Sequence, residues 1–341
     1  MPLPYHLDQP VTIPLFKAHR TEENTENGMI LPENSVIPDI THWFEALPAV
    51  YIVFIGICSV LVVAIFVMTL RMVWFVHYCV NNEYYQGDLY FIIWMPLFVS
   101  VVCLIGNIIP RAAAIMYAVG LVYLMMCLHI SIILIIRLFG TRKEMTDWLI
   151  ENKKVFHFDV RPYCCCCHCL PSVQPTPKRV RYLSYLVKQS PMVRIFLQLV
   201  LVIISLEGVW DSGPTVQIIN GVGVASTLLA VFMCHVIVTS VREHLEPYNM
   251  NVIFRCVDIS QMLFTFQKFI LDLISKNGGM GGLTDASPSM VSRFWHNVAM
   301  TFELTLVCFV LFRNVIPEKS IFFAEKKALR QNGNAVPMTD L

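Results

Sequence analysis

The chain has 341 residues, of which 56% are hydrophobic and only 14% are charged, and its formal net charge is +1. Soluble proteins carry about 25% charged residues. The apolar content excludes disordered and collagen-like chains, and the balanced charge excludes nucleic-acid binding through a whole-chain basic field. A large apolar soluble core and a polytopic membrane protein remain, and the placement of the charges decides between them.

Seven stretches with few charges are long enough to cross a bilayer, which takes about 20 apolar residues in a helix. Soluble domains do not need several helices that are apolar all round. The sequence therefore predicts an all-α, polytopic membrane protein with seven transmembrane helices. We expect these spans at about residues 47–70, 89–109, 112–136, 192–210, 216–240, 251–274 and 294–313.

The lysines and arginines predict the orientation, because cytoplasmic segments carry an excess of them. With the N-terminus outside, 18 of these 25 residues face the cytoplasm and five face the exterior. We therefore expect an extracellular tail (1–45), a seven-span domain (46–315) and a cytoplasmic C-terminal tail (316–341). Arg111 follows Pro110 between the second and third spans, where we expect it to act as an interface anchor.

The cytoplasmic loop 137–194 contains a run of cysteines interrupted by His168 and followed by Pro171. Adjacent cysteines point apart and no second Cys/His cluster follows, which disfavours tetrahedral zinc. Disulfides are disfavoured on the cytoplasmic side. Exposed juxtamembrane cysteines beside basic residues favour S-acylation over a simple cysteine-rich turn. The expected lipidation sites are Cys164, Cys165, Cys166, Cys167 and Cys169.

Earlier in the same loop, Met145, Trp148 and Leu149 have helical spacing and lie between charged residues. This pattern indicates a short amphipathic helix. Two placements remain open for it, one on the membrane interface and one packed against neighbouring loops.

The sixth span is unusually polar, and at 100° per residue six of its polar side chains share an arc of about 140°. Ionisable groups within a membrane face protein or water and point to function by default. The stripe either lines a path for an anionic solute, with Arg255 or Lys268 as counter-ion, or its charges neutralise one another at i,i+3 and i,i+4. A further alternative is that Arg255 and Asp272 lie near the interfaces and extend their charges into water. The members of the stripe are Arg255, Asp258, Gln261, Thr265, Lys268 and Asp272.

Polar residues in the other spans are fewer. His296 and Glu303 are seven residues apart on the last span, so they share a helical face that can meet the stripe. We include both in the expected substrate path. Thr227, Gly221 and Gly223 on the fifth span are typical of close helix packing, and an isolated histidine such as His235 is typical of hydrogen-bonded packing.

No motif for nucleophilic hydrolysis, phosphate binding or HExxH metal chemistry is found in the sequence. We therefore expect a protein that is not an enzyme and that needs no cofactor, metal or nucleic acid.

Several segments resemble the organic solute transporter alpha subunit family over about residues 46–315. Val99–Arg111, which ends in Ile-Pro-Arg, is similar to the family's second span, and Gly223–Ala230 is similar to its fifth. The cysteine run with Pro171 resembles the family's polycysteine segment. Further likenesses in the sixth span and the loop after it involve Asn249, Met250, Phe254, Gln267 and Asn277.

The resemblance implies facilitated, bidirectional transport, without ATP, of amphipathic organic anions such as steroid conjugates or bile-acid-like solutes. It also implies a multi-pass protein of the cell membrane, acylated cysteines among the membrane lipids, and a small single-span beta subunit as obligate partner. We expect a lateral path bounded by the fifth, sixth and seventh spans. The alternatives are an acylated seven-span scaffold that regulates trafficking or signalling, and a seven-helix receptor. The receptor is disfavoured because its Asp-Arg-Tyr and Asn-Pro-x-x-Tyr motifs are not seen.

Overall fold

The computed structural model describes residue 44 and residues 47–80, 82–158, 172–206, 214–276, 288–316 and 320–323, all within one unit, Ile37–Leu341. In these residues the only β-structure is an antiparallel bridge between Phe156 and Val173. The long helices are α2 (Ala49–Cys79), α3 (Glu83–Ile93), α4 (Met95–Ile108), α5 (Ala113–Leu138), α7 (Pro177–Leu206), α8 (Pro214–Ser240), α10 (Met250–Lys276) and α11 (Pro288–Asn314). The short elements are η1 (Pro110–Ala112), α6 (Arg142–Glu151), α9 (Arg242–Leu245), η2 (Glu246–Tyr248) and η3 (Ile321–Phe323). The all-α prediction is confirmed for this part of the chain.

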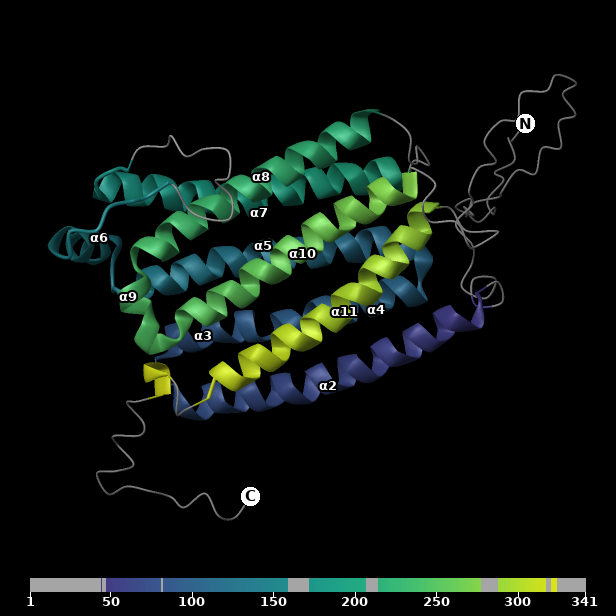
Figure 1. Cartoon of the computed structure of the whole chain (residues 1–341), viewed down its shortest axis with the longest axis horizontal. Coiled ribbons are helices and arrows are strands. Elements are labelled where there is room, and N and C mark those ends of the chain that lie inside the picture. Colours follow the sequence, from purple (N-terminus) through teal and green to yellow (C-terminus); the bar gives the residue numbers. More distant parts are fainter. Residues whose placement is uncertain are drawn as a thin grey trace, which may run out of the picture. The chain divides into compact units, whose positions relative to one another are not determined.

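The long helices lie side by side (Figure 1). Helix α11 packs against α10, α4 and α2, while α5 packs against α4, α7 and α10. Helix α8 packs mainly on α7 and touches α10 only slightly. Helices α5, α10 and α11 therefore form the middle of the bundle, and any polar group that they bury is shielded from the surroundings.

Six of the described segments are long and apolar enough to cross a membrane. They are Ala49–Cys79, Glu83–Ile108, Pro110–Leu138, Pro177–Ile204, Ile218–Ser240 and Met290–Asn314. Helix α10 has a comparable length of 27 residues, but it is more polar and is not among the six. The multi-pass character that the sequence predicts is thus confirmed, with six apolar spans in the described residues.

The outward surface of the bundle is apolar. Val60, Val63 and Val67 on α2 and Phe196 and Leu199 on α7 are all more than half exposed. Exposed apolar faces of this extent suit the acyl chains of a bilayer and would be costly in water.

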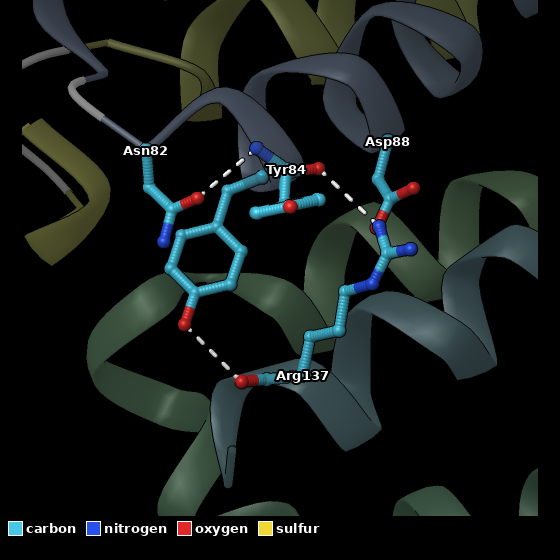
Figure 2. A network of polar contacts seen from close by, with 5 residues as sticks. Asn82, Tyr84, Asp88 and Arg137 are labelled. Atoms are coloured by element: carbon cyan, nitrogen blue, oxygen red, sulfur yellow. Dashed lines mark hydrogen bonds and ion pairs between the residues drawn. The ribbon is translucent and has the colours of Figure 1, made fainter. Parts of the chain in front are cut away.

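A polar network fastens α3 to the end of α5 (Figure 2). The Asn82 side-chain oxygen caps α3 by accepting a hydrogen bond of 3.0 Å from the Tyr84 amide. Arg137 Nη1 donates to Asp88 Oδ2 at 2.5 Å and to the Tyr84 carbonyl at 3.4 Å. The guanidinium also lies 5.7 Å from the centre of the Tyr84 ring, at cation–π distance. One arginine thus holds both the side chains and the backbone of α3.

Helix α6 is the amphipathic helix that the sequence predicts. Thr141 caps it, because its hydroxyl accepts from the Glu144 amide at 3.2 Å and donates to the Glu144 carboxylate at 3.0 Å. Gly140 precedes the cap with a φ of +87°, a conformation that glycine adopts without strain. Met145 and Leu149 are fully buried. Of the two placements, the structure favours packing within the protein.

Candidate substrate path

The polar stripe of α10 is mostly buried inside the bundle. Asp258, Gln261, Thr265 and Lys268 are each less than 9% exposed, and Asp272 is half-buried. Arg255 differs, because it is exposed and lies close to the start of the helix. The structure therefore brings five of the six stripe residues onto the inward face of α10 and leaves Arg255 apart.

Two of these residues form an ion pair on the same helix. Lys268 Nζ contacts Asp272 Oδ1, as the i,i+4 spacing allows. The same carboxylate oxygen accepts a hydrogen bond of 2.7 Å from the Ser292 hydroxyl on α11. The charge of Lys268 is thus offset within α10, and Asp272 joins α10 to α11.

An aromatic cluster adjoins the pair. Tyr117 on α5 stacks on Phe264, with ring centroids 4.9 Å apart. His296 on α11 makes T-shaped contacts with both rings, with centroids 5.0 Å from Phe264 and 5.8 Å from Tyr117. Lys268 Nζ lies 5.8 Å from the centre of the Tyr117 ring, which places its charge over the aromatic face. We call Tyr117, Phe264, Lys268, Asp272 and His296 the polar core.

His296 is fully buried, and within the described residues neither of its ring nitrogens has a hydrogen-bond partner. A buried polar group in this condition is rare and costs about 1–3 kcal/mol. His296 therefore lies where a ligand that can exchange a hydrogen bond would be stabilised.

Glu303, which the sequence groups with His296, lies elsewhere. Its Oε1 accepts a hydrogen bond of 2.9 Å from Gln267 Nε2, and Gln267 is on the other side of α10 from the stripe. Both residues are half-buried. Gln267 also lines a groove of about 370 Å³ on α10, whose other lining residues are Met262, Leu263, Phe266, Ile270 and Leu271. Glu303 thus pairs with Gln267, away from the polar stripe, and is not part of the polar core.

Asp258 also finds its partner on another helix. Its Oδ2 lies 2.9 Å from His235 Nε2 on α8. Since α8 and α10 otherwise touch only slightly, this contact is a main link between them. Gln261 bonds within α10, where its Nε2 donates to the Thr265 hydroxyl at 3.0 Å.

Sequence reasoning missed Arg194. The sequence places it at the edge of the cytoplasmic loop, but α7 begins at Pro177, so Arg194 lies well inside the helix. It is 3% exposed, and its Nε donates to the Thr227 hydroxyl on α8 at 2.9 Å. Gly223 leaves the space for this, because a Cβ there would be 2.3 Å from Arg194 Nη1. Thr227 and the nearby Gly221 and Gly223 indicated close helix packing in the sequence, but not a buried cation.

The remaining expected site residues are at the surface or outside the described part. Arg111 is exposed within η1, between α4 and α5. The cysteine run, Cys164, Cys165, Cys166, Cys167 and Cys169, lies outside the described residues. Within the described residues, no group of three or more His, Cys, Asp or Glu side chains could hold a metal ion.

Comparison with known proteins places these features in a family. The family described as organic solute transporter Ostalpha matches residues 52–314, which is most of the chain and includes every residue of the polar core. The chain belongs to the organic solute transporter alpha family. The resemblance read from the sequence is thereby confirmed, and the chain is a membrane transporter by family.

Members of the organic solute transporter alpha family in animals are similar to it along much of their length. Organic solute transporter alpha-like protein 1 of Caenorhabditis elegans is 30% identical, over 84% of this chain and 75% of that protein. Alpha-like protein 2 of the same organism is 23% identical over 88% of each. Organic solute transporter subunit alpha of Homo sapiens is 27% identical over 63% of each. The word subunit in that name indicates a heteromer. No solved structure is detectably similar to the chain.

Proposed function

We propose that the chain is the alpha-type subunit of a transporter for amphipathic organic anions such as steroid conjugates or bile-acid-like solutes. Transport is facilitated, bidirectional and independent of ATP. The subunit acts in the cell membrane as a seven-span protein, with the N-terminus outside, and works with a small single-span beta subunit. Family membership supports the transport of an organic solute, and the name of the human relative supports a subunit role.

The observation that carries the proposal is the burial of charged and polar groups in the middle of an apolar bundle. Lys268 and Asp272 form an ion pair, and Lys268 lies over the Tyr117 ring that also contacts His296. Neither ring nitrogen of His296 has a hydrogen-bond partner within the described residues. Burying charges in a membrane is costly, and charges that are kept there mark solute or ion pathways. Lys268 is the stripe cation that we assign to this path, because Arg255 is exposed near the other end of α10.

Apolar surfaces complete an amphipathic path. Phe264 is buried in the polar core, while Phe269 is 54% exposed on the outside of α10. The groove beside Gln267 is lined almost entirely by apolar side chains. We propose that solutes enter laterally, between α8, α10 and α11, with the ring body on such apolar walls and the anionic group toward the polar core.

The test is uptake of a radiolabelled steroid sulfate into cells that express the chain with or without a candidate beta subunit. We expect uptake only with both. The variant Lys268→Gln with Asp272→Asn removes the pair without leaving a lone charge and should reduce uptake about tenfold, which corresponds to about 1.4 kcal/mol of lost interaction. Arg255→Gln is the matched control and should leave uptake near that of the wild type.

Both variants must reach the cell surface in wild-type amounts for the comparison to hold. Absence of steroid sulfate uptake by the wild-type pair would refute the proposed substrate class. Unchanged uptake when Arg255 and Lys268 are both replaced by Gln would refute a counter-ion role for the stripe.

We also propose that the cysteine run Cys164–Cys169 is S-acylated and anchors the segment between α6 and α7 to membrane lipids. Two or more acyl chains anchor a segment stably, since each buried methylene contributes about 0.8 kcal/mol. Cells fed a clickable palmitate analogue should yield labelled protein whose label is removed by hydroxylamine. A variant with all five cysteines replaced by Ser should carry no label, and persistent labelling would contradict this assignment.

A further inference from the structure

Arg194 is a buried cation whose charge is not compensated within the described residues. Its side chain is 3% exposed, and its Nη2 has no hydrogen-bond partner. The ion pairs of the described residues involve Arg137, Lys154, His235 and Lys268, and none involves Arg194. Its one hydrogen bond is to a neutral hydroxyl, that of Thr227.

A structural role for Arg194 does not account for this arrangement. A hydrogen bond between helices needs only a neutral side chain, and a guanidinium buried without a counter-charge costs several kcal/mol. Planar guanidinium groups bind oxyanions through two parallel hydrogen bonds. Arg194 Nε already donates to Thr227, whereas Nη2 has no partner and can donate a hydrogen bond to such an anion.

His296 supplies an independent observation that points to the same place. It is fully buried with both ring nitrogens unpartnered. Tyr117 connects the two residues, because its ring makes a T-shaped contact with His296 and its helix, α5, packs against α7, which carries Arg194. Arg194 and His296 therefore lie on helices that are linked through α5 and Tyr117, and Lys268 lies over the same tyrosine ring.

Arg194 is the buried cation without an acidic partner among the described residues. Lys268 is paired with Asp272, and the buried Asp258 contacts His235. An anion bound between Arg194 and His296 would neutralise the charge of Arg194 and would give His296 the hydrogen bond that it lacks. A neutral ligand could supply only the hydrogen bond, and a cation would add to the uncompensated charge of Arg194.

We propose that Arg194 and His296 form an oxyanion site around Tyr117 that holds the sulfate, sulfonate or carboxylate group of the transported solute. Arg194 supplies the charge and His296 a hydrogen bond. The identity of the solute rests on the proposed function, whereas the site itself rests on the contacts described above. The phosphate of an anionic lipid has the same oxyanion chemistry, so the experiment must distinguish the two.

Binding of a radiolabelled steroid sulfate to the purified complex in phosphatidylcholine nanodiscs tests the site. Arg194→Gln should weaken binding by at least about tenfold, and Arg194→Lys should weaken it less, because it keeps the charge but not the planar fork. His296→Phe keeps the ring and should also weaken binding. The matched controls are Lys188→Gln on the exposed side of α7 and His129→Phe on α5. Wild-type affinity in both Arg194→Gln and His296→Phe would overturn the proposal.

A second pair of variants moves the guanidinium without removing it. At Gly223 an added Cβ would be 2.3 Å from Arg194 Nη1, so Gly223→Ala must displace the guanidinium. At Gly221 on the same helix, an added Cβ meets nothing within 4 Å. Gly223→Ala should therefore weaken binding several-fold while Gly221→Ala leaves it unchanged. Equal affinities in these two variants would overturn the site even if the Arg194 variants do not fold.

Nanodiscs that contain phosphatidylserine separate the two sources of oxyanion. Steroid sulfate should bind equally well in them, and Arg194-dependent displacement by phosphatidylserine would overturn the assignment of the site to the solute. Flux in reconstituted vesicles separates the site from the proposed function. Binding that depends on Arg194, without any flux, would support the site and refute transport. Flux and binding that are unchanged in the Arg194 variants would support transport and overturn the site.

Discussion

Lys268 and Arg194 are both buried cations in long helices, but their charges are compensated differently. Lys268 contacts Asp272 one turn later on its own helix, so the pair moves as a unit with α10. Arg194 reaches across to α8, where it meets a hydroxyl and the bare backbone at Gly223. At the scale of residues, this difference makes Lys268 part of a neutral pair and Arg194 the cation open to a ligand.

Asp88 provides a residue-scale test of the fold that is separate from transport. Its side chain is 13% exposed and accepts a charge-assisted hydrogen bond from Arg137. Asp88→Asn should lower the free energy of unfolding by about 1 kcal/mol, because the arginine side of the pair is partly solvated. Asp147→Asn makes the same chemical change at an exposed site on α6 and should have almost no effect.

Thermal unfolding of the purified protein in detergent measures both variants. A loss of about 1 kcal/mol should lower the melting temperature by a few degrees. Equal melting temperatures for the two variants would show that the pair does not stabilise the junction of α3 and α5.

At the scale of elements, α10 shows how a polar helix can lie inside an apolar bundle. Its stripe faces α5 and α11, and its main charged groups are joined to neighbouring helices. Asp258 meets His235 on α8, and Asp272 meets Ser292 on α11. Because these partners replace the hydrogen bonds of water, burying the α10 charges costs less than burying a lone charge in a bilayer.

Helix α7 differs from α10 because most of its charged residues lie in its first turns. Its 30 residues extend about 45 Å at 1.5 Å per residue, whereas the hydrocarbon core of a bilayer is about 30 Å thick. The first turns carry Lys178, Arg179 and Arg181 and therefore extend beyond the acyl chains. The same helix thus contributes basic residues to the membrane surface and, further along, the buried Arg194.

At the scale of the whole molecule, the number of spans and the orientation are linked. Six apolar spans alone would leave both termini on one side of the membrane, whereas a seventh span formed by α10 would separate them. The pairing of the α10 charges with other helices supports seven spans. The abundance of Lys and Arg between α5 and α7 and after α11 supports a cytoplasmic location for these segments.

Epitope tags in intact and permeabilised cells test this topology. A tag at the N-terminus and a tag between α10 and α11 should bind antibody in intact cells. A tag at the C-terminus should bind it only after permeabilisation. Should the N-terminal and C-terminal tags react alike, α10 does not cross the membrane and the seven-span proposal is wrong.

Three features could be predicted from the order of the residues: which segments are apolar enough to form long helices, the polar stripe of α10, and the possible pairing of Lys268 with Asp272. These features depend on hydropathy and on helical spacing within one segment, both of which are local. The family likeness was also visible in short motifs. The packing of the helices was needed to learn that Asp258 contacts His235, that Glu303 accepts a hydrogen bond from Gln267, and that Arg194 is buried against Gly223. These contacts could not be predicted, because the burial of a side chain and its hydrogen-bond partners depend on neighbouring helices from distant parts of the chain.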